Sequence, residues 1–368
     1  MLARTSDTSP LVDGLVFKKK LIRRVFRWID VLYRLIHPNV SAATLKTPQK
    51  ILVSNLGNLG DVLIASHAIQ RLREAYPQAE IGVLISSRGR SALEVIPHIT
   101  WVHEFNHLYH ARESIGLCKA ALQHFLGKRR IVKEIQSHEY DLAIDLQPFF
   151  PNAIPLLHAA KIPLRIGYLT AGFGSYLTHP LQWTEFERYL GQQHLQSLKA
   201  IGVPICDRYP LTILPAQVSA APFTLPSNYI VIHMCASRKE KEWKRDSWIK
   251  LIKKLKQLKF EVVLAGRGSR DKEESDFVSS KTGCVNFCNK LTLSQYKQLL
   301  ESARLLITVD SMSVHLGALC QTPTVILFLT PNSPFLWTPA NNCCRTVFLY
   351  SFASEEQKLE AIFQAVNV

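Results

Sequence analysis

Two segments in the second half of the sequence carry residue types that bind phosphate. The first follows the apolar run 229–233 and combines a hydroxyl residue with five cations: Ser237, Arg238, Lys239, Lys241, Lys244 and Arg245. Cations at the carboxyl end of a strand can neutralise a diphosphate. The alternative is a run of charge that only faces solvent.

The second segment, TVDSMSVH, follows the apolar run 305–309 and opens a short helix. Asp310 and Ser311 lie at its strand-to-helix turn, Met312 follows, and His315 lies within the helix. Backbone N–H groups at a helix start can hold an anion. The commoner use of Asp310 or Ser311 would be as a helix cap.

A third turn, SNLGNLGD at 54–61, contains Gly57, Asn58, Gly60 and Asp61 after the apolar run 51–53. Its G-x-x-G spacing differs from the G-x-G-x-x-G dinucleotide signature. A carboxylate at this helix start would repel a pyrophosphate, whereas it suits the positive helix end. We therefore expect Asp61 either to cap the helix or to act as a general base.

Two further turns carry polar groups. The strand predicted at 142–146 places Asp145 and Gln147 at its end. Gly266 and Gly268 form another turn, with Glu273 at a helix start, where a carboxylate can bind ribose hydroxyls or serve as a first-turn acid.

Strands and helices alternate around these turns. Apolar runs predict strands at 51–54, 81–85, 101–105, 142–146, 229–233, 261–264, 305–309 and 324–328. Helical patterns lie at 61–76, 90–96, 112–137, 248–258, 272–279, 293–303, 315–319 and 354–366. The alternation predicts an α/β fold of doubly wound parallel sheets. Four prolines within 209–228 indicate a linker between two Rossmann-like halves that face across a cleft.

The resulting organisation is a basic extension (1–48), an amino-terminal domain (49–215) and a carboxy-terminal domain (216–368). Residues 15–36 predict an amphipathic helix ended by His37 and Pro38. Residues 1–50 hold ten Lys/Arg and three Asp, a net charge of +7. This balance suits an anionic membrane surface; the alternative is a helix packed on the protein.

The overall composition limits the classes of protein to which this chain can belong. The 368 residues are 47% hydrophobic, enough for sizeable cores, and contain no long apolar run of transmembrane type. The amino terminus lacks a signal-peptide pattern, so export is not expected. The eight scattered cysteines show no paired metal-ligand spacing, so we expect buried free thiols in a reducing compartment.

Five segments, in this order, resemble the heptosyltransferases of glycosyltransferase family 9, which build the inner core of lipopolysaccharide. They begin with ILVSNLGNLGDVLIASHAIQRLREAYPQAEIGVL, continue with YDLAIDLQ followed by RIGY as the second segment, and end with VIHMCASRKEKEWKRDSWIKLIKKL, VVLAGRGSRDKEE and LLITVDSMSVHLGALCQTPTVILF. The resemblance covers about residues 50–340. Met312 stands where the family commonly has glycine.

The resemblance implies a GT-B fold and assigns roles by position. Asp61 matches the catalytic aspartate that deprotonates the acceptor hydroxyl, within the acceptor-side loop of Gly57, Asn58 and Gly60. The donor phosphates would be bound by Lys241, Ser237, Ser311 and Met312. The donor sugar and nucleoside would be bound by Asp310, His315 and Glu273, with Asp271 and Glu274 competing for the ribose.

The implied activity is inverting, metal-independent transfer of a heptose from ADP-heptose to a lipid-anchored, phosphorylated saccharide. We expect no cofactor, no metal and no nucleic-acid partner, and a location at the cytoplasmic face of the inner membrane. Two alternatives remain open: a related GT-B enzyme with another nucleotide sugar, and a non-catalytic membrane-associated binding protein.

Overall fold

The computed structural model describes residues 28, 31–32, 47–106, 117–148, 153–183, 188–205, 228–331, 334–339 and 343–366. The chain divides into two compact units. Unit 1 comprises Met1–Arg90, His98–Phe186 and Gln193–Tyr209; unit 2 comprises Ser91–Pro97, Glu187–Gln192 and Pro210–Val368.

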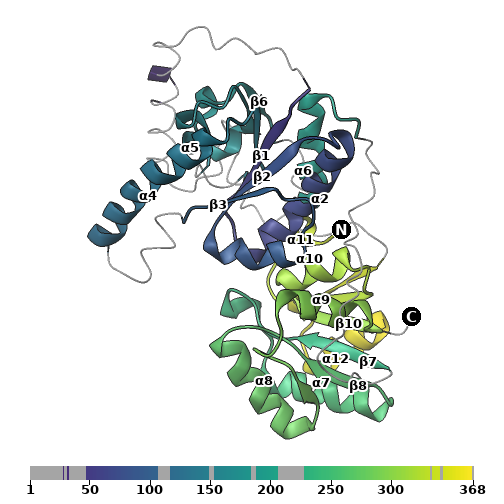
Figure 1. Ribbon diagram of the computed structural model, residues 1–368. Coiled ribbons are helices and arrows are strands. Elements are labelled where there is room, and N and C mark those ends of the chain that lie inside the picture. Colours follow the sequence, from purple (N-terminus) through teal and green to yellow (C-terminus); the bar gives the residue numbers. More distant parts are fainter. Residues whose placement is uncertain are drawn as a thin grey trace. The chain divides into compact units, whose positions relative to one another are not determined.

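Unit 1 is built on a six-stranded parallel sheet of order β3-β2-β1-β4-β5-β6 (Figure 1). Its strands are β1 (Lys50–Asn55), β2 (Glu80–Ile85), β3 (Trp101–Glu104), β4 (Leu142–Asp145), β5 (Leu164–Tyr168) and β6 (His179–Leu181). Its α-helices are α2 (Leu59–Ala75), α4 (Leu117–Ser137), α5 (Ile154–Ala159) and α6 (Leu190–Ser197), the last of which begins in a stretch assigned to unit 2.

Unit 2 repeats this plan with the order β12-β11-β10-β7-β8-β9. Its strands are β7 (Tyr229–His233), β8 (Glu261–Leu264), β9 (Val285–Asn286), β10 (Leu305–Val309), β11 (Thr324–Phe328) and β12 (Cys344–Phe348). Its α-helices are α7 (Arg245–Gln257), α8 (Ser269–Thr282), α9 (Leu293–Glu301), α10 (Met312–Leu319), α11 (Pro334–Trp337) and α12 (Glu355–Val366).

Short 3₁₀ turns complete the description. They are η1 (Ser87–Glu94), η2 (Leu169–Ala171), η3 (Gly174–Tyr176), η4 (Leu198–Ile201), η5 (Lys239–Lys241) and η6 (Leu349–Ser351).

Apolar side chains on both faces of the central strands explain why these sheets are covered on two sides. In β11, Val325 and Leu327 pack in one cluster with α7 and α12, whereas Ile326 and Phe328 pack with Val314 of α10. Alternate residues of a strand point to opposite faces. The helices α7 and α12 therefore lie on one face of this sheet and α10 lies on the other.

Each sheet has one topological switch point, where the strand order reverses. In unit 1 it lies between β1 and β4, and in unit 2 between β7 and β10. Ligands of open α/β sheets bind outside the carboxyl ends of strands at such points. The helix α2 that follows β1 carries Asp61 in its first turn, and the segments after β7 and β10 carry Lys241 and Asp310.

The eight predicted strands are confirmed to within one residue at each end, and the alternation predicted the fold correctly. The short helix expected at 90–96 is present as a 3₁₀ helix, and it lies earlier, at Ser87–Glu94. Of the basic extension only Trp28, Val31, Leu32 and its last two residues, 47 and 48, are described; the first three are helical and exposed. The rest of that extension, and nearly all of the proline-rich linker, lie outside the described residues.

Candidate functional site

Asp61 occupies the third position of α2, not its cap. The helix begins at Leu59 with Asn58 as the N-cap, so the expectation that Asp61 itself caps the helix is wrong in detail. Its carboxylate Oδ2 accepts a hydrogen bond from the backbone N–H of Asn58 at 2.8 Å. A third-position acid that bonds back to the N-cap backbone is one half of a capping box.

The turn that carries Asp61 is fixed by side chains of the strand ends. Asn55 accepts from the Gly57 N–H at 3.0 Å and donates to the Asp61 carbonyl at 3.1 Å. Ser86, after β2, donates to the Gly57 carbonyl at 2.6 Å. A Cβ added at Gly57 would lie 2.6 Å from the Asp61 carboxylate, so glycine leaves the room that this carboxylate fills.

Asp145, the last residue of β4, is buried beside this turn. Its Oδ1 accepts from the Ser54 hydroxyl at 2.9 Å, and Ser54 is its register partner on β1. Within the described part of the chain, Asp145 Oδ2 and the nearby Gln147 Oε1 have no hydrogen-bond donor. Burial raises the pKa of Asp145 to about 7, against the opposing effect of the Ser54 hydrogen bond.

Unit 2 brings Lys241 and Asp310 together from opposite sides of its switch point. Lys241 Nζ lies 2.5 Å from Asp310 Oδ2, and the two side chains are 16% and 11% exposed. The residues are 69 positions apart in sequence. This ion pair places a cation beside the start of α10.

The start of α10 matches the sequence-based expectation of a cap. Ser311 is the N-cap, and its hydroxyl accepts from the Ser313 N–H at 3.3 Å. Met312 is the first helical residue. His315 is buried and lies 3.3 Å from the Tyr189 hydroxyl within the same unit. Burial lowers the pKa of His315 to about 4, which keeps the imidazole neutral at pH 7.

The cationic segment is less uniform than its sequence indicates. Arg245 begins α7 and forms ion pairs with Glu273 at 2.8 Å and Glu274 at 2.5 Å, so it is not a loop cation. Ser237 is exposed in the loop. Glu242 accepts from the Ala236 N–H at 2.9 Å and pairs with Arg270 at 2.6 Å. The pairing of Glu242 with Arg270 as a support of this loop was not predictable, because the two residues are 28 positions apart in the sequence.

The turn after β8 places Asp271, rather than Glu273, at the helix start. Helix α8 begins at Ser269, so Asp271 is its third residue and Glu273 lies beyond the first turn. Glu273 is 72% exposed. Asp271 packs against Gly266, where an added Cβ would lie 2.5 Å from its carboxylate. Burial, followed by the charge of Glu242, raises the pKa of Asp271 to about 6.

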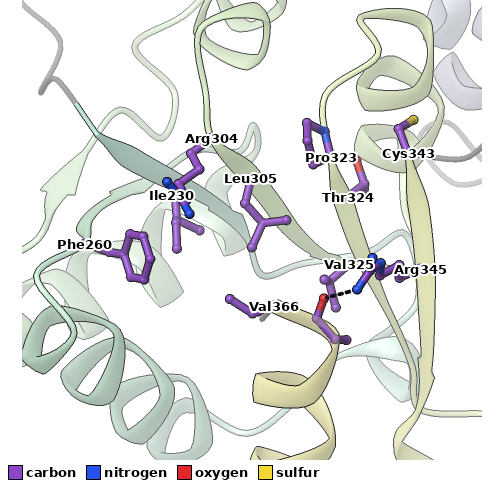
Figure 2. A pocket seen from close by; sticks show the side chains of 11 residues that line it. Ile230, Phe260, Arg304, Leu305, Pro323, Thr324, Val325, Cys343, Arg345 and Val366 are labelled. Carbon is purple, nitrogen blue, oxygen red and sulfur yellow. Dashed lines mark hydrogen bonds between the residues drawn. The ribbon is translucent and has the colours of Figure 1, made fainter. Parts of the chain in front are cut away.

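A separate cavity of about 280 Å³ lies at the opposite ends of the strands in the sheet of unit 2 (Figure 2). Leu305 and Thr324, which start β10 and β11, line it together with Arg304, Arg345 and Val366. It therefore lies at the amino ends of the strands, away from Lys241 and Asp310.

In the residues that the structure describes, no group of three or more His, Cys, Asp or Glu is placed to hold a metal ion. No described helix is long and apolar enough to cross a membrane. Six cysteines are described as free thiols, of which Cys235, Cys284 and Cys288 are buried and the other three are partly exposed.

Comparison with known proteins gives the family. The model of glycosyltransferase family 9 (heptosyltransferase) matches residues 128–366. The lipopolysaccharide core heptosyltransferase OpsX of Haemophilus influenzae is 22% identical over 85% of this chain and 88% of its own length.

Two solved structures share the fold. The glycosyltransferase family 9 protein of Veillonella parvula aligns with a TM-score of 0.71 at 20% identity, over 89% of this chain and 99% of that one. The ADP-heptose lipopolysaccharide heptosyltransferase II of E. coli aligns with a TM-score of 0.69 at 20% identity, over 86% and 98%. With its two Rossmann-like domains in the GT-B class and a family match over most of its length, this chain belongs to glycosyltransferase family 9, the heptosyltransferases.

Proposed function

We propose that this glycosyltransferase moves a heptose from ADP-heptose to a lipid-anchored, phosphorylated saccharide of the lipopolysaccharide inner core. The observation that carries the donor side is the Lys241–Asp310 pair beside the cap of α10 at the switch point of unit 2. The relatives supply the sugar: one is named a core heptosyltransferase, and one solved neighbour is named for ADP-heptose.

On the acceptor side, Asp61 is the proposed general base. Its carboxylate is held at the carboxyl end of β1 by the Asn58 N–H, and Gly57 leaves the space beside it. A base in this position would take the proton of the attacking hydroxyl, with attack on the anomeric carbon from the face opposite the diphosphate. The proposed reaction therefore inverts the anomeric configuration.

On the donor side, the leaving diphosphate gains negative charge as the glycosidic bond breaks. Lys241 and the backbone N–H groups at the start of α10 would stabilise that charge. Ser237, Ser311 and Met312 complete the proposed phosphate-binding set, and Asp310 and His315 lie beside it. Lys241 and the start of α10 provide positive charge from the chain itself, and the mechanism we propose is independent of a divalent cation.

For the nucleoside ribose we favour Asp271 over Glu273. Asp271 lies in the first turn of α8 after the glycine turn, whereas the Glu273 carboxylate is paired with Arg245. Asp271→Asn should weaken ADP binding measured by calorimetry, and Glu273→Gln should change it less than twofold. If Glu273→Gln weakened ADP binding more than Asp271→Asn did, Glu273 would be the residue that binds the ribose.

The proposed location is the cytoplasmic face of the inner membrane, where a lipid-anchored acceptor would be available. The net charge of +15, and of +7 within residues 1–50, favours an anionic lipid surface. Protein lacking residues 1–40 should bind anionic vesicles less tightly than the full chain, and equal binding would contradict this role of the extension.

A donor panel tests the activity. Purified protein is incubated with lipopolysaccharide that lacks heptose and with ADP-heptose, UDP-sugars or GDP-sugars, and the acceptor mass and anomeric configuration are measured. We expect transfer from ADP-heptose alone, an inverted product and an unchanged rate in EDTA. If the protein turned over a UDP- or GDP-sugar and did not bind ADP-heptose, the proposal that ADP-heptose is the donor would be wrong. ADP binding without transfer to any acceptor would favour a binding protein.

A further inference from the structure

The outer face of helix α4 combines exposed apolar and cationic side chains. Phe125 and Leu126 are 52% and 56% exposed, and Arg129, Arg130 and Lys133 are exposed as well. Helical neighbours recur every three or four residues. Phe125, Arg129 and Lys133 therefore form one row along the helix, with Leu126 and Arg130 in the row beside it.

The opposite face of α4 belongs to the core of unit 1. Ile131 and Ile135 are fully buried in a cluster with Leu52 and Leu84 of the central strands. The helix is thus already anchored by one apolar stripe, and the outer residues are not needed for that packing. Two large apolar side chains that face solvent next to each other are unusual on a helix that is otherwise charged outside.

The charge of this face has one sign. In the described residues, Lys128, Arg129, Arg130 and Lys133 have no carboxylate partner. The nearest acid in the sequence, Glu134, pairs with His103 at 2.7 Å. The Arg129 guanidinium lies 4.7 Å from the centre of the Phe125 ring, so apolar and cationic groups share one surface. Figure 1 shows α4 extending past the sheet of unit 1.

We propose that the outer face of α4, formed by Phe125, Leu126, Arg129, Arg130 and Lys133, is a membrane-contact surface for anionic phospholipid. Phe125 and Leu126 enter the boundary between headgroups and acyl chains, and the three cations contact the phosphates. Cationic charge alone would fit nucleic acid equally well, but the adjacent apolar pair favours lipid. The residues of this surface are distinct in sequence from the basic amino-terminal extension.

The inference deepens the proposed function, because a second contact would help to hold the enzyme at a surface that carries its acceptor. Two weak contacts on one chain bind a surface more tightly than either does alone. The α4 surface belongs to unit 1, which also carries the proposed base Asp61.

The proposed membrane contact of α4 is tested by measuring how tightly full-length variants bind vesicles in a sedimentation assay. The vesicles contain phosphatidylethanolamine with phosphatidylglycerol, or phosphatidylcholine alone as the neutral comparison. We expect Phe125→Ala/Leu126→Ala to weaken binding to anionic vesicles roughly tenfold. Arg129→Gln/Arg130→Gln should weaken it by a similar factor at low salt and by less at high salt.

A matched control comes from unit 2, where Leu258 and Phe335 are 51% and 57% exposed. Leu258→Ala/Phe335→Ala removes comparable apolar area and should leave binding within twofold of wild type. An equal loss in this control, or unchanged binding in both α4 variants, overturns the proposal. Because every variant keeps the amino-terminal extension, the differences report α4 alone.

Hydrogen exchange gives a second readout that does not depend on total affinity. Amides of residues 122–130 should exchange more slowly on anionic vesicles, and unchanged exchange there would contradict insertion. Transfer to a deacylated, water-soluble acceptor should be the same for the α4 variants and wild type. If no acceptor is glycosylated by any form, the proposed function fails while the vesicle result still decides the α4 surface.

Discussion

Asp61 has two roles at the scale of a single residue, since its carboxylate both completes a helix start and is the proposed base. These roles separate chemically, because an amide oxygen can accept the Asn58 N–H bond but cannot take the acceptor proton. Asp61→Asn should lower kcat by roughly 10²–10⁴-fold with little change in the melting temperature. Asp61→Ala should lose the same activity and, in addition, about 1 kcal/mol of stability.

Paired activity and thermal-unfolding measurements on the two variants check this. Full activity in Asp61→Asn would reduce Asp61 to a structural role. An equal loss of stability in both variants would mean that the amide does not replace the capping bond.

The Lys241–Asp310 pair allows a double-mutant cycle. Removal of one partner from a buried pair costs up to roughly 3–5 kcal/mol, and we expect less here because both side chains keep some exposure. Lys241→Ala should also weaken ADP binding by roughly 10–100-fold, the contribution of one charged hydrogen bond. Combining Lys241→Ala with Asp310→Ala should recover part of the lost stability but not the lost ADP affinity.

Urea unfolding and calorimetry measure the two quantities. The matched control is Lys244→Ala in the same segment, where Lys244 is exposed. If Lys241→Ala and Lys244→Ala bound ADP with equal affinity, the proposal that Lys241 binds the donor phosphates would be wrong.

At the scale of elements, the turn between β1 and α2 depends on a missing side chain. Gly57→Ala would place a methyl group 2.6 Å from the Asp61 carboxylate, so the carboxylate must move. We expect a lower kcat with an almost unchanged KM for the donor, because the donor-binding residues lie in unit 2. Gly127→Ala is the control, since the nearest atom to its Cβ would be 3.7 Å away. Steady-state kinetics with both substrates measure kcat and the two KM values. A raised KM for the donor in Gly57→Ala would contradict this expectation.

The contact between β1 and β4 gives a pH dependence of stability. The pKa of Asp145 is about 7 in the folded chain and lies near 4 in an unfolded one. Between these values the folded chain holds a proton that the unfolded chain has released, so stability falls as pH rises. Asp145→Asn cannot ionise, and its stability relative to wild type should therefore be higher at pH 8 than at pH 5.

Urea titrations at the two pH values give this difference, which should be on the order of a few kcal/mol. A relative stability that is the same at both pH values would show that Asp145 is ionised normally in the fold.

The elements that the sequence predicted share a physical cause. Central parallel strands are apolar on both faces, so runs such as 229–233 and 305–309 are recognisable without any partner. Four strands were missed. Three of them, β6, β9 and β12, are edge strands with half-exposed residues, and their patterns resemble those of loops. The fourth, β5, is an internal and buried strand, but Arg165 and Gly167 interrupt its apolar run. The helix α5 has only six residues, too few for a helical period to appear.

The candidate site was predictable where one turn holds a whole feature, as at Ser311 and its helix. It was not predictable where partners come from distant segments. The Lys241–Asp310 pair joins two turns, and Arg245 pairs with Glu273 from another helix. Such pairings depend on which strands are neighbours in the sheet, and a single sequence does not state this.

At the scale of the whole molecule, two units with separate cores should respond separately to the donor nucleotide. A ligand that binds only the folded state stabilises it by RT ln(1 + [L]/Kd), about 2.7 kcal/mol at 100 times Kd. ADP should therefore slow hydrogen exchange in unit 2, above all at residues 309–319, and leave the strands of unit 1 almost unchanged. If ADP slowed hydrogen exchange in unit 1 alone, the nucleotide site would have to be assigned to unit 1.

The hydrogen bond from Asn58 to Asp61 also sets a limit on the working temperature. The proposed base lies in the first turn of α2, and the terminal turns of helices open more easily than the protein unfolds. Warming would fray this turn and displace the carboxylate while both cores stay intact. The reaction rate would then pass its maximum several degrees below the melting point, and recover fully on cooling.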